Sequence, residues 1–281
     1  MKAPVAWFFI GLFLLVCLVF LIAPTAMLAV QAVTGDEGLT WQYVATLGEY
    51  RYRVAFAHSL YLSLSSATVG VIAGGFIAFA VLKQDAPRWM RTVVTSFSAV
   101  AANFAGVPLA FAFIATLGSL GLLTSMLKRI GIDLYGLGFS LFSITGLTLV
   151  YSYFQIPLMV IIISPAIEAL APSWREAAEN LGASTAQYWR LVGLPVLAPS
   201  LLAAWILLFG SAFSAYATAY ALTSGNISLV TTEISAVLSG NVSSEPQVGG
   251  ALSVGMIVVM VLVLALSHAI ARRASRWTVK S

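Results

Sequence analysis

Long apolar runs constrain this chain more than any other feature of its sequence. Several blocks of about 20 or more apolar residues occur, and a helix of roughly 20 residues crosses the hydrocarbon core of a bilayer. Lipid offers the backbone no hydrogen-bonding partner, so each crossing segment must be helical. Hydrophobic residues make up 60% of the chain and charged residues 9%, against about a quarter charged in soluble domains. The sequence therefore predicts an all-α integral membrane protein.

The apolar blocks predict six transmembrane helices. These span Trp7 to Val33, His58 to Leu82, Val93 to Leu117, Ser140 to Glu168, Pro199 to Leu222, and Val248 to Ile270. The first block is longer than the apolar core of a secretory signal, roughly 7–15 residues, so we expect it to be retained. The predicted organisation is a first helix with its outer loop over 1–57, a five-helix core over 58–270, and a basic tail over 271–281.

The distribution of lysine and arginine predicts the orientation of the chain. With the amino terminus inside, the inner segments contain most of the basic residues: Lys2, Lys83, Arg88, Arg91, Arg175, Arg190, Arg272, Arg273, Arg276 and Lys280. The outer loops contain Arg51, Arg53, Lys128 and Arg129. Positive charge is retained on the cytoplasmic side, so both termini are expected in the cytoplasm. The net charge of +4 then reflects topology and gives no support to nucleic-acid binding.

One inner segment, from Leu170 to Ala198, is unusually long and structured. Ser173 and Glu176 have the spacing of a capping box, as do Ser184 and Gln187, so two short helices are predicted. Gly182 should end the first helix, because glycine adopts the left-handed conformation without a steric penalty. The second helix is predicted to end around Gly193 and Pro195, before the next span begins at Pro199.

The first of these short helices has one apolar stripe. Trp174, Ala177, Ala178 and Leu181 recur at the spacing of a single helix face. Such a stripe on a water-exposed loop indicates a docking surface for a soluble partner. The alternative is an interfacial helix that lies on lipid headgroups, and the residues alone leave both interpretations open.

Within this loop the sequence resembles a known family. Glu176-Ala177-Ala178, followed by Gly182 and by Val192-Gly193-Leu194-Pro195, is similar to the EAA signature of type I ABC importer permeases that depend on a solute-binding protein. The signature usually has Ile where this chain has Val192. A weaker similarity extends over about 58–270 and includes His58-Ser59-Leu60 at the second span.

The resemblance implies that the loop carries a coupling helix seated on a separate ATPase subunit. The residues implied to contact that subunit are Glu176, Ala177, Ala178, Gly182, Ala183, Leu194 and Pro195. It also implies a bacterial inner-membrane complex of two ATPases, a second permease chain and an extracytoplasmic solute receptor. The sequence has no Gly-Lys pair for a phosphate-binding loop. ATP and Mg are therefore expected on the ATPase, with no cofactor, metal or catalytic residue on this chain.

Polar residues within the spans are the candidate lining of a solute path. Ser211, Ser214 and Thr218 should share one helix face, with Tyr216 and Tyr220 on roughly the opposite face. Further candidates in other spans are Asn103, Tyr151 and Gln155. The alternative is that the small hydroxyl residues only allow helices to pack closely.

The alternative function is an ion-coupled secondary transporter. Such carriers need buried carboxylates or broken helices near the midplane, and the sequence indicates neither. Glu168 and Glu233 are expected in solvated positions at span ends or in loops. The run from Phe213 to Tyr220 is weakly similar to permeases of the polyamine, thiamine and iron group. A polyamine or another small solute is therefore the expected cargo, with its carboxylate ligands supplied by the receptor.

Overall fold

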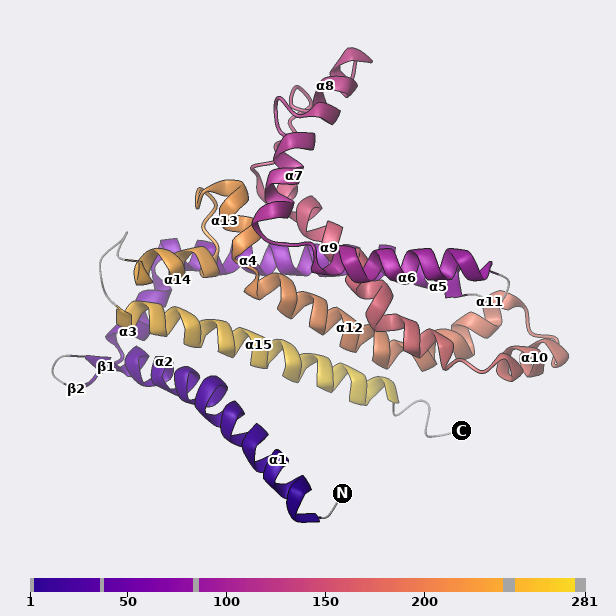
Figure 1. Ribbon diagram of the computed structural model, residues 1–281, viewed down its shortest axis with the longest axis horizontal. Coiled ribbons are helices and arrows are strands. Elements are labelled where there is room, and N and C mark those ends of the chain that lie inside the picture. Colours follow the sequence, from indigo (N-terminus) through magenta and orange to yellow (C-terminus); the bar gives the residue numbers. More distant parts are fainter. Residues whose placement is uncertain (1–2, 36–37, 83–85, 240–245, 276–281) are drawn as a thin grey trace. The chain divides into compact units, whose positions relative to one another are not determined.

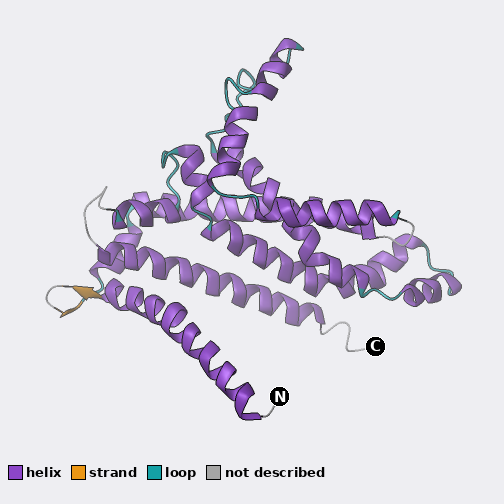
Figure 2. Ribbon diagram, viewed as in Figure 1, coloured by secondary structure: helices purple, strands orange, loops and turns teal. Residues whose placement is uncertain are grey.

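The computed structural model describes residues 3–35, 38–82, 86–239 and 246–275. Figure 2 shows that helices dominate, with one short antiparallel hairpin, β1 (Thr34–Gly35) and β2 (Gly38–Leu39). Within these residues six helices are long and apolar enough to cross a membrane, the number that the sequence predicted. Of the basic tail predicted over 271–281, residues 276–281 and all of the side chains lie outside the described part of the chain.

The chain divides into two compact units. The first unit comprises residues 1–56 and 228–260. Its elements are α1 (Ala3–Cys17), the π-helical turn η1 (Leu18–Ile22), α2 (Ala23–Val33), the hairpin, α3 (Gln42–Ala45), the 3₁₀ turn η2 (Thr46–Gly48), the start of α4 (Tyr50–Val69), α14 (Val230–Leu238) and most of α15 (Pro246–Ser275).

The core of the first unit lies where α4, α14 and α15 pack together. Its buried residues are Tyr52, Ala55, Val230, Val237, Val248 and Leu252. Glu233 of α14 is also buried, and its Oε2 lies 2.6 Å from Nη2 of Arg51 on α4. The expectation that Glu233 is solvated is therefore wrong, because α14 turns this side chain inward toward a cation that the sequence places 182 positions away.

The second unit comprises residues 57–227 and 261–281. Its elements are the rest of α4, the π-helical turn η3 (Gly70–Gly74), α5 (Gly75–Leu82), α6 (Arg88–Asn103), α7 (Val107–Leu117), α8 (Leu122–Arg129), α9 (Ile144–Glu168), α10 (Pro172–Asn180), α11 (Thr185–Tyr188), the π-helical turn η4 (Trp189–Gly193), α12 (Leu194–Ser214), α13 (Ala217–Thr223) and the end of α15.

Helix α9 is the centre of the second unit. It contacts α5, η3, α6, α7 and α12 (Figure 1). Its first turn is capped by Ser143, whose hydroxyl accepts a hydrogen bond from the Gly146 amide at 3.2 Å. The side chains of Leu147, Tyr151, Met159 and other residues along α9 are fully buried. The helix is therefore surrounded by protein over most of its length.

Two glycines bring the second span against α9. A Cβ on Gly70 would lie 3.0 Å from Cβ of Gln155 on α9, and one on Gly74 would lie 2.5 Å from the carbonyl oxygen of Ile156. Small residues four apart allow membrane helices to approach this closely. No prediction from the sequence included this pair, although its four-residue spacing is present there.

Two predicted spans are interrupted. The helix predicted over Val93–Leu117 breaks between α6 and α7, where Gly106 has a φ of 81° and Pro108 follows; the helix long enough to cross begins at Val107 and runs through α8 to Arg129. The helix predicted over Pro199–Leu222 breaks at Ala215 and Tyr216. Broken helices, which the sequence did not indicate, are therefore present.

The prediction that the second helix of the loop ends around Gly193 and Pro195 is wrong. The helix continues through η4 into α12, so that one helix runs from Thr185 to Ser214. Proline has no amide hydrogen for the bond to the preceding turn, and a π-turn adjusts the helix where that bond is missing. The same arrangement occurs at η1, which directly precedes Ala23 and Pro24.

Candidate functional site

Helix α10 begins at a proline. Pro172 occupies the first turn and Ala171 the N-cap, which suits proline because the first amides of a helix have no intrahelical acceptor. Ser173 therefore lies inside the first turn and caps nothing. The predicted capping box of Ser173 and Glu176 is wrong for this reason.

The turn after α10 follows the prediction. Gly182 has a φ of 79°, its amide donates to the carbonyl of Glu179 at 2.9 Å, and the amide of Ala183 donates to that of Ala178 at 2.9 Å. These two bonds define a Schellman motif, which closes a helix through a left-handed residue. The chain then enters α11 through the predicted capping box. Ser184 Oγ accepts from the Gln187 amide at 3.3 Å, and Gln187 Oε1 accepts from the Ser184 amide at 2.7 Å.

The surface of α10 is open along its whole length. Every residue of this helix is described, and none is buried. Trp174 is 44% exposed and Leu181, just after the helix, is 88% exposed. Arg175 Nε donates to Glu179 Oε1 at 2.9 Å along the polar side. An exposed helix with a bulky apolar stripe and a rigid turn provides a surface that a partner can bind.

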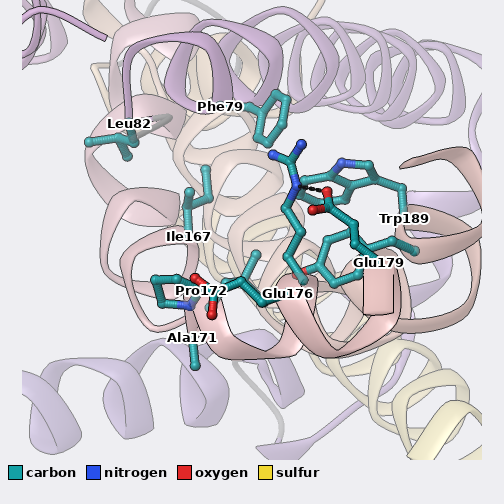
Figure 3. A pocket seen from close by; sticks show the side chains of 11 residues that line it. Phe79, Leu82, Ile167, Ala171, Pro172, Glu176, Glu179 and Trp189 are labelled. Atoms are coloured by element: carbon teal, nitrogen blue, oxygen red, sulfur yellow. Dashed lines mark hydrogen bonds and ion pairs between the residues drawn. The ribbon is translucent and has the colours of Figure 1, made fainter. Parts of the chain in front are cut away.

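A hollow of about 330 Å³ lies beside α10. Figure 3 shows Glu176, Glu179 and Pro172 of α10 around it, with Phe79, Ile167 and Trp189 contributed by other helices. The Trp189 ring packs edge-on against Phe79 at 4.7 Å between centroids. A Cβ on Gly193 would lie 2.5 Å from that indole, so the glycine of the signature makes room for Trp189.

The docking residues implied by the resemblance fall into two groups. Glu176, Ala177, Ala178, Gly182 and Ala183 lie together on α10 and its turn. Leu194 and Pro195 instead lie in the first turn of α12, and Leu194 lines an apolar groove of about 510 Å³ between helices.

Three of the path candidates are buried, and two of them bridge the broken helices. The Tyr151 hydroxyl donates to the Ala215 carbonyl at 2.9 Å, where α12 ends. The Gly106 amide, freed by the break before α7, donates to Thr218 Oγ1 at 2.8 Å. Gln155 Nε2 donates to the Leu208 carbonyl at 2.9 Å. The Tyr151 and Thr218 contacts satisfy backbone groups that a helix break would otherwise leave unpaired in an apolar environment, whereas Leu208 lies inside α12.

The remaining path candidates are more accessible. Asn103 and Ser214 are exposed and Ser211 is half-buried. The Asn103 amide donates to the Ala99 carbonyl at 2.8 Å, and the Ser214 hydroxyl donates to the Gly210 carbonyl at 2.9 Å. The prediction that Ser211, Ser214 and Thr218 share one helix face is wrong. The helix breaks between Ser214 and Thr218.

The sequence did not predict, or predicted only in part, the roles of other residues near the helix breaks and span ends. Gly106 and Ala215 provide the backbone groups at the two breaks, and only Gly106, next to Pro108, has a recognisable sequence signal. Tyr216 and Tyr220 form the predicted pair, with rings stacked at 5.2 Å between centroids. Glu168, expected to be solvated, is half-exposed and forms an ion pair with Arg91 across α9 and α6.

Comparison with known proteins identifies one family. The sequence pattern of the family described as "binding-protein-dependent transport system inner membrane component" matches residues 70–280. A stretch of 64 residues is 39% identical to the sulfate transport system permease protein CysT of Salmonella typhimurium and covers 23% of this chain and 23% of that protein.

Solved structures share the fold. A bacterial ABC transporter involved in the import of the acidic polysaccharide alginate has a chain with a TM-score of 0.75 and 17% identity, over 97% of this chain and 96% of that one. The same transporter in complex with an alginate pentasaccharide-bound periplasmic protein gives a TM-score of 0.73 at 17% identity, over 97% and 95% of the two chains.

Proposed function

The chain belongs to the family of binding-protein-dependent transport system inner membrane components, and from that premise we propose that it forms half of a solute path and is driven through α10. As a member of this family it is a multi-pass inner-membrane permease subunit of an ABC importer and not an enzyme. ATP hydrolysis takes place on a partner subunit.

Coupling is assigned to α10 and its turn. The observation that supports this most directly is that α10 buries none of its residues while its end is fixed by the Schellman motif at Gly182. A rigid exposed lever can transmit a movement of the ATPase as a rigid body. In this proposal Glu176, Ala177, Ala178 and the turn contact the ATPase, whereas Leu194 and Pro195 hold the helix that the lever moves.

The solute path is assigned to Asn103, Ser211 and Ser214, of which Asn103 and Ser214 are exposed and Ser211 is half-buried. A second permease chain, identical or related, would cover these positions, since one bundle forms one wall. Tyr151 and Thr218 act behind these positions by holding the broken helices, and Gln155 joins α9 to α12. Two ATPases and an extracytoplasmic receptor complete the assembly, and both termini face the cytoplasm.

The solute is proposed to be small and delivered by the receptor. A polyamine follows from the resemblance of the Phe213–Tyr220 run. An anion is the second candidate, supported by the 64-residue likeness to a permease named for sulfate. Identification of the ligand that copurifies with the proposed receptor distinguishes the two, because a polyamine and an anion carry opposite charges.

The coupling proposal is tested at Gly182. Valine is β-branched and does not adopt the left-handed conformation, which costs ordinary residues roughly 1–2 kcal/mol. A Cβ at Gly182 has no heavy atom within 4 Å among the described residues, so the substitution affects the turn and not the packing of the chain. We expect Gly182→Val to insert into the membrane and assemble but to hydrolyse ATP without solute uptake.

The matched control is Gly182→Asn, because asparagine tolerates the left-handed region. This variant should retain coupled uptake. Normal uptake by Gly182→Val, measured beside ATP hydrolysis in proteoliposomes, would remove the turn from the mechanism.

A further inference from the structure

An apolar groove runs along the outside of the second unit. Its volume is about 510 Å³, within the range of pockets that hold small organic ligands, roughly 300–1,000 Å³. The groove lies between η3–α5, the end of α9 and the start of α12, and its walls include Ile72, Phe76, Ile163, Leu194 and Leu197. Phe76 is 72% exposed and Ile72 is 55% exposed, so the groove is open on one side.

This groove is continuous with the hollow beside α10. Phe79, Ile167 and Trp189 line both spaces. The hollow, seen in Figure 3, has a different chemistry, because Arg175, Glu176 and Glu179 surround it. The combined surface is thus apolar at one end and charged at the other, and the Trp189 indole lies at the change.

The change in polarity lies where a membrane interface is expected. Arg91 at the start of α6 pairs with Glu168 at the end of α9, and Trp89 beside it is 67% exposed. Tryptophan and charged residues concentrate at the headgroup level of a bilayer. The apolar groove therefore extends toward the hydrocarbon core, and the hollow lies among the headgroups.

We propose that this surface binds one phospholipid that carries a primary ammonium group. An acyl chain occupies the groove, and the headgroup lies in the hollow beneath α10. In the hollow Arg175 Nε donates to Glu179 Oε1 at 2.9 Å, and Glu176 adds a second carboxylate that can accept from a compact ammonium donor. An anionic headgroup without an ammonium would face an excess of carboxylate.

This lipid would join the bilayer to the lever. Arg175, Glu176 and Glu179 belong to α10, whereas the acyl chain would contact α5, α9 and α12. The binding proposal does not depend on the proposed coupling, because lipid occupancy is measured on the chain without an ATPase.

Photolabelling in nanodiscs tests the site. The probe is a phosphatidylethanolamine with a diazirine in one acyl chain, diluted in phosphatidylcholine, and labelled peptides are mapped by mass spectrometry. We expect saturable labelling of α5 and the start of α12. Unlabelled phosphatidylethanolamine should compete several-fold better than phosphatidylcholine or phosphatidylglycerol, and Glu176→Gln should reduce that preference.

Gly75 allows the groove to be filled without disturbing the fold. A Cβ there would meet only Met159 Cε, at 3.8 Å, and Gly75 lines the groove. Gly75→Leu should therefore abolish most of the labelling, and Phe76→Ala should weaken it by removing apolar contact. The matched control is Ala80→Leu, which adds the same side chain to an exposed position of α5 outside the groove and should label like the unmodified chain.

Three outcomes would overturn the proposal. Labelling of Gly75→Leu at the unmodified level would show that the probe binds elsewhere. Equal competition by all three lipids would exclude headgroup recognition. A cysteine introduced at Phe76, in a chain with Cys17 replaced by Ser, that cross-links two copies in the nanodisc would show that a second protein chain covers the groove.

Discussion

Glu233 shows how far a single residue can differ from what its neighbours in sequence suggest. It follows a polar stretch between two spans, which indicates a solvated loop, yet its side chain is 6% exposed. Its Oε2 lies 2.6 Å from the Arg51 guanidinium, although no well-aligned hydrogen bond reaches that oxygen among the described residues. The attraction is therefore mainly Coulombic and offsets the cost of removing the carboxylate from water.

This pair makes a prediction at the residue scale. Arg51→Met should lower the stability of the purified chain by roughly 1–3 kcal/mol, because a buried charge loses its partner. The double variant Arg51→Met, Glu233→Gln should recover part of that loss, because no charge then remains buried. Thermal unfolding in detergent of both single variants and the double variant forms the required cycle. Additive losses would mean that the two side chains do not interact.

The same scale explains which site residues the sequence could predict. Gly182, Ser184 and Gln187 act on backbone groups within a few positions of themselves, and their spacing predicted the turn and the cap. Tyr151, Thr218 and Gln155 act on backbone groups of other helices. Their polarity drew attention to them, but which groups they bind depends on packing that one sequence does not reveal.

At the scale of elements, the apolar runs predicted the number of long helices but not their interruptions. The break before α7 has a local cause, Gly106 followed by Pro108. The break after α12 follows no proline or glycine, and the Ala215 carbonyl is held by Tyr151 from another helix. At Pro195 the sequence predicted a helix end, but the helix continues through a π-turn. A proline thus marks a change of helix geometry and not always an end.

Helix packing at η3 gives a prediction with an adjacent control. Gly74→Ala places a methyl group 2.5 Å from the Ile156 carbonyl, and overpacking of this kind costs typically 1–3 kcal/mol. Gly75→Ala places the same group 3.8 Å from a flexible methionine end and should change stability by less than about 1 kcal/mol. Thermal unfolding of the two purified variants tests this comparison. Equal melting temperatures would contradict the close approach of η3 and α9.

At the scale of the whole molecule, two sources of energy for transport can be compared, ATP hydrolysis on a partner subunit and an ion gradient. The interrupted helices remove one argument against an ion-coupled carrier, because such carriers use broken helices at their binding sites. The breaks here have a different chemistry, since the described contacts join backbone groups to neutral side chains. Membership of the permease family favours an external ATPase as the source of energy, and the exposed surface of α10 is compatible with its binding.

Transport by the complete assembly should therefore depend on ATP and not on an ion gradient. In proteoliposomes that contain the chain, its permease partner, the ATPases and the receptor, uptake should stop when a non-hydrolysable ATP analogue replaces ATP. Ionophores that collapse proton and sodium gradients should leave the initial rate unchanged, because the described contacts at the helix breaks involve neutral groups. The chain and its permease partner reconstituted without ATPases should give no uptake above empty vesicles, even with a gradient imposed. Uptake driven by that gradient would instead assign the broken helices to ion binding, and α10 would then lose its role as the input of energy.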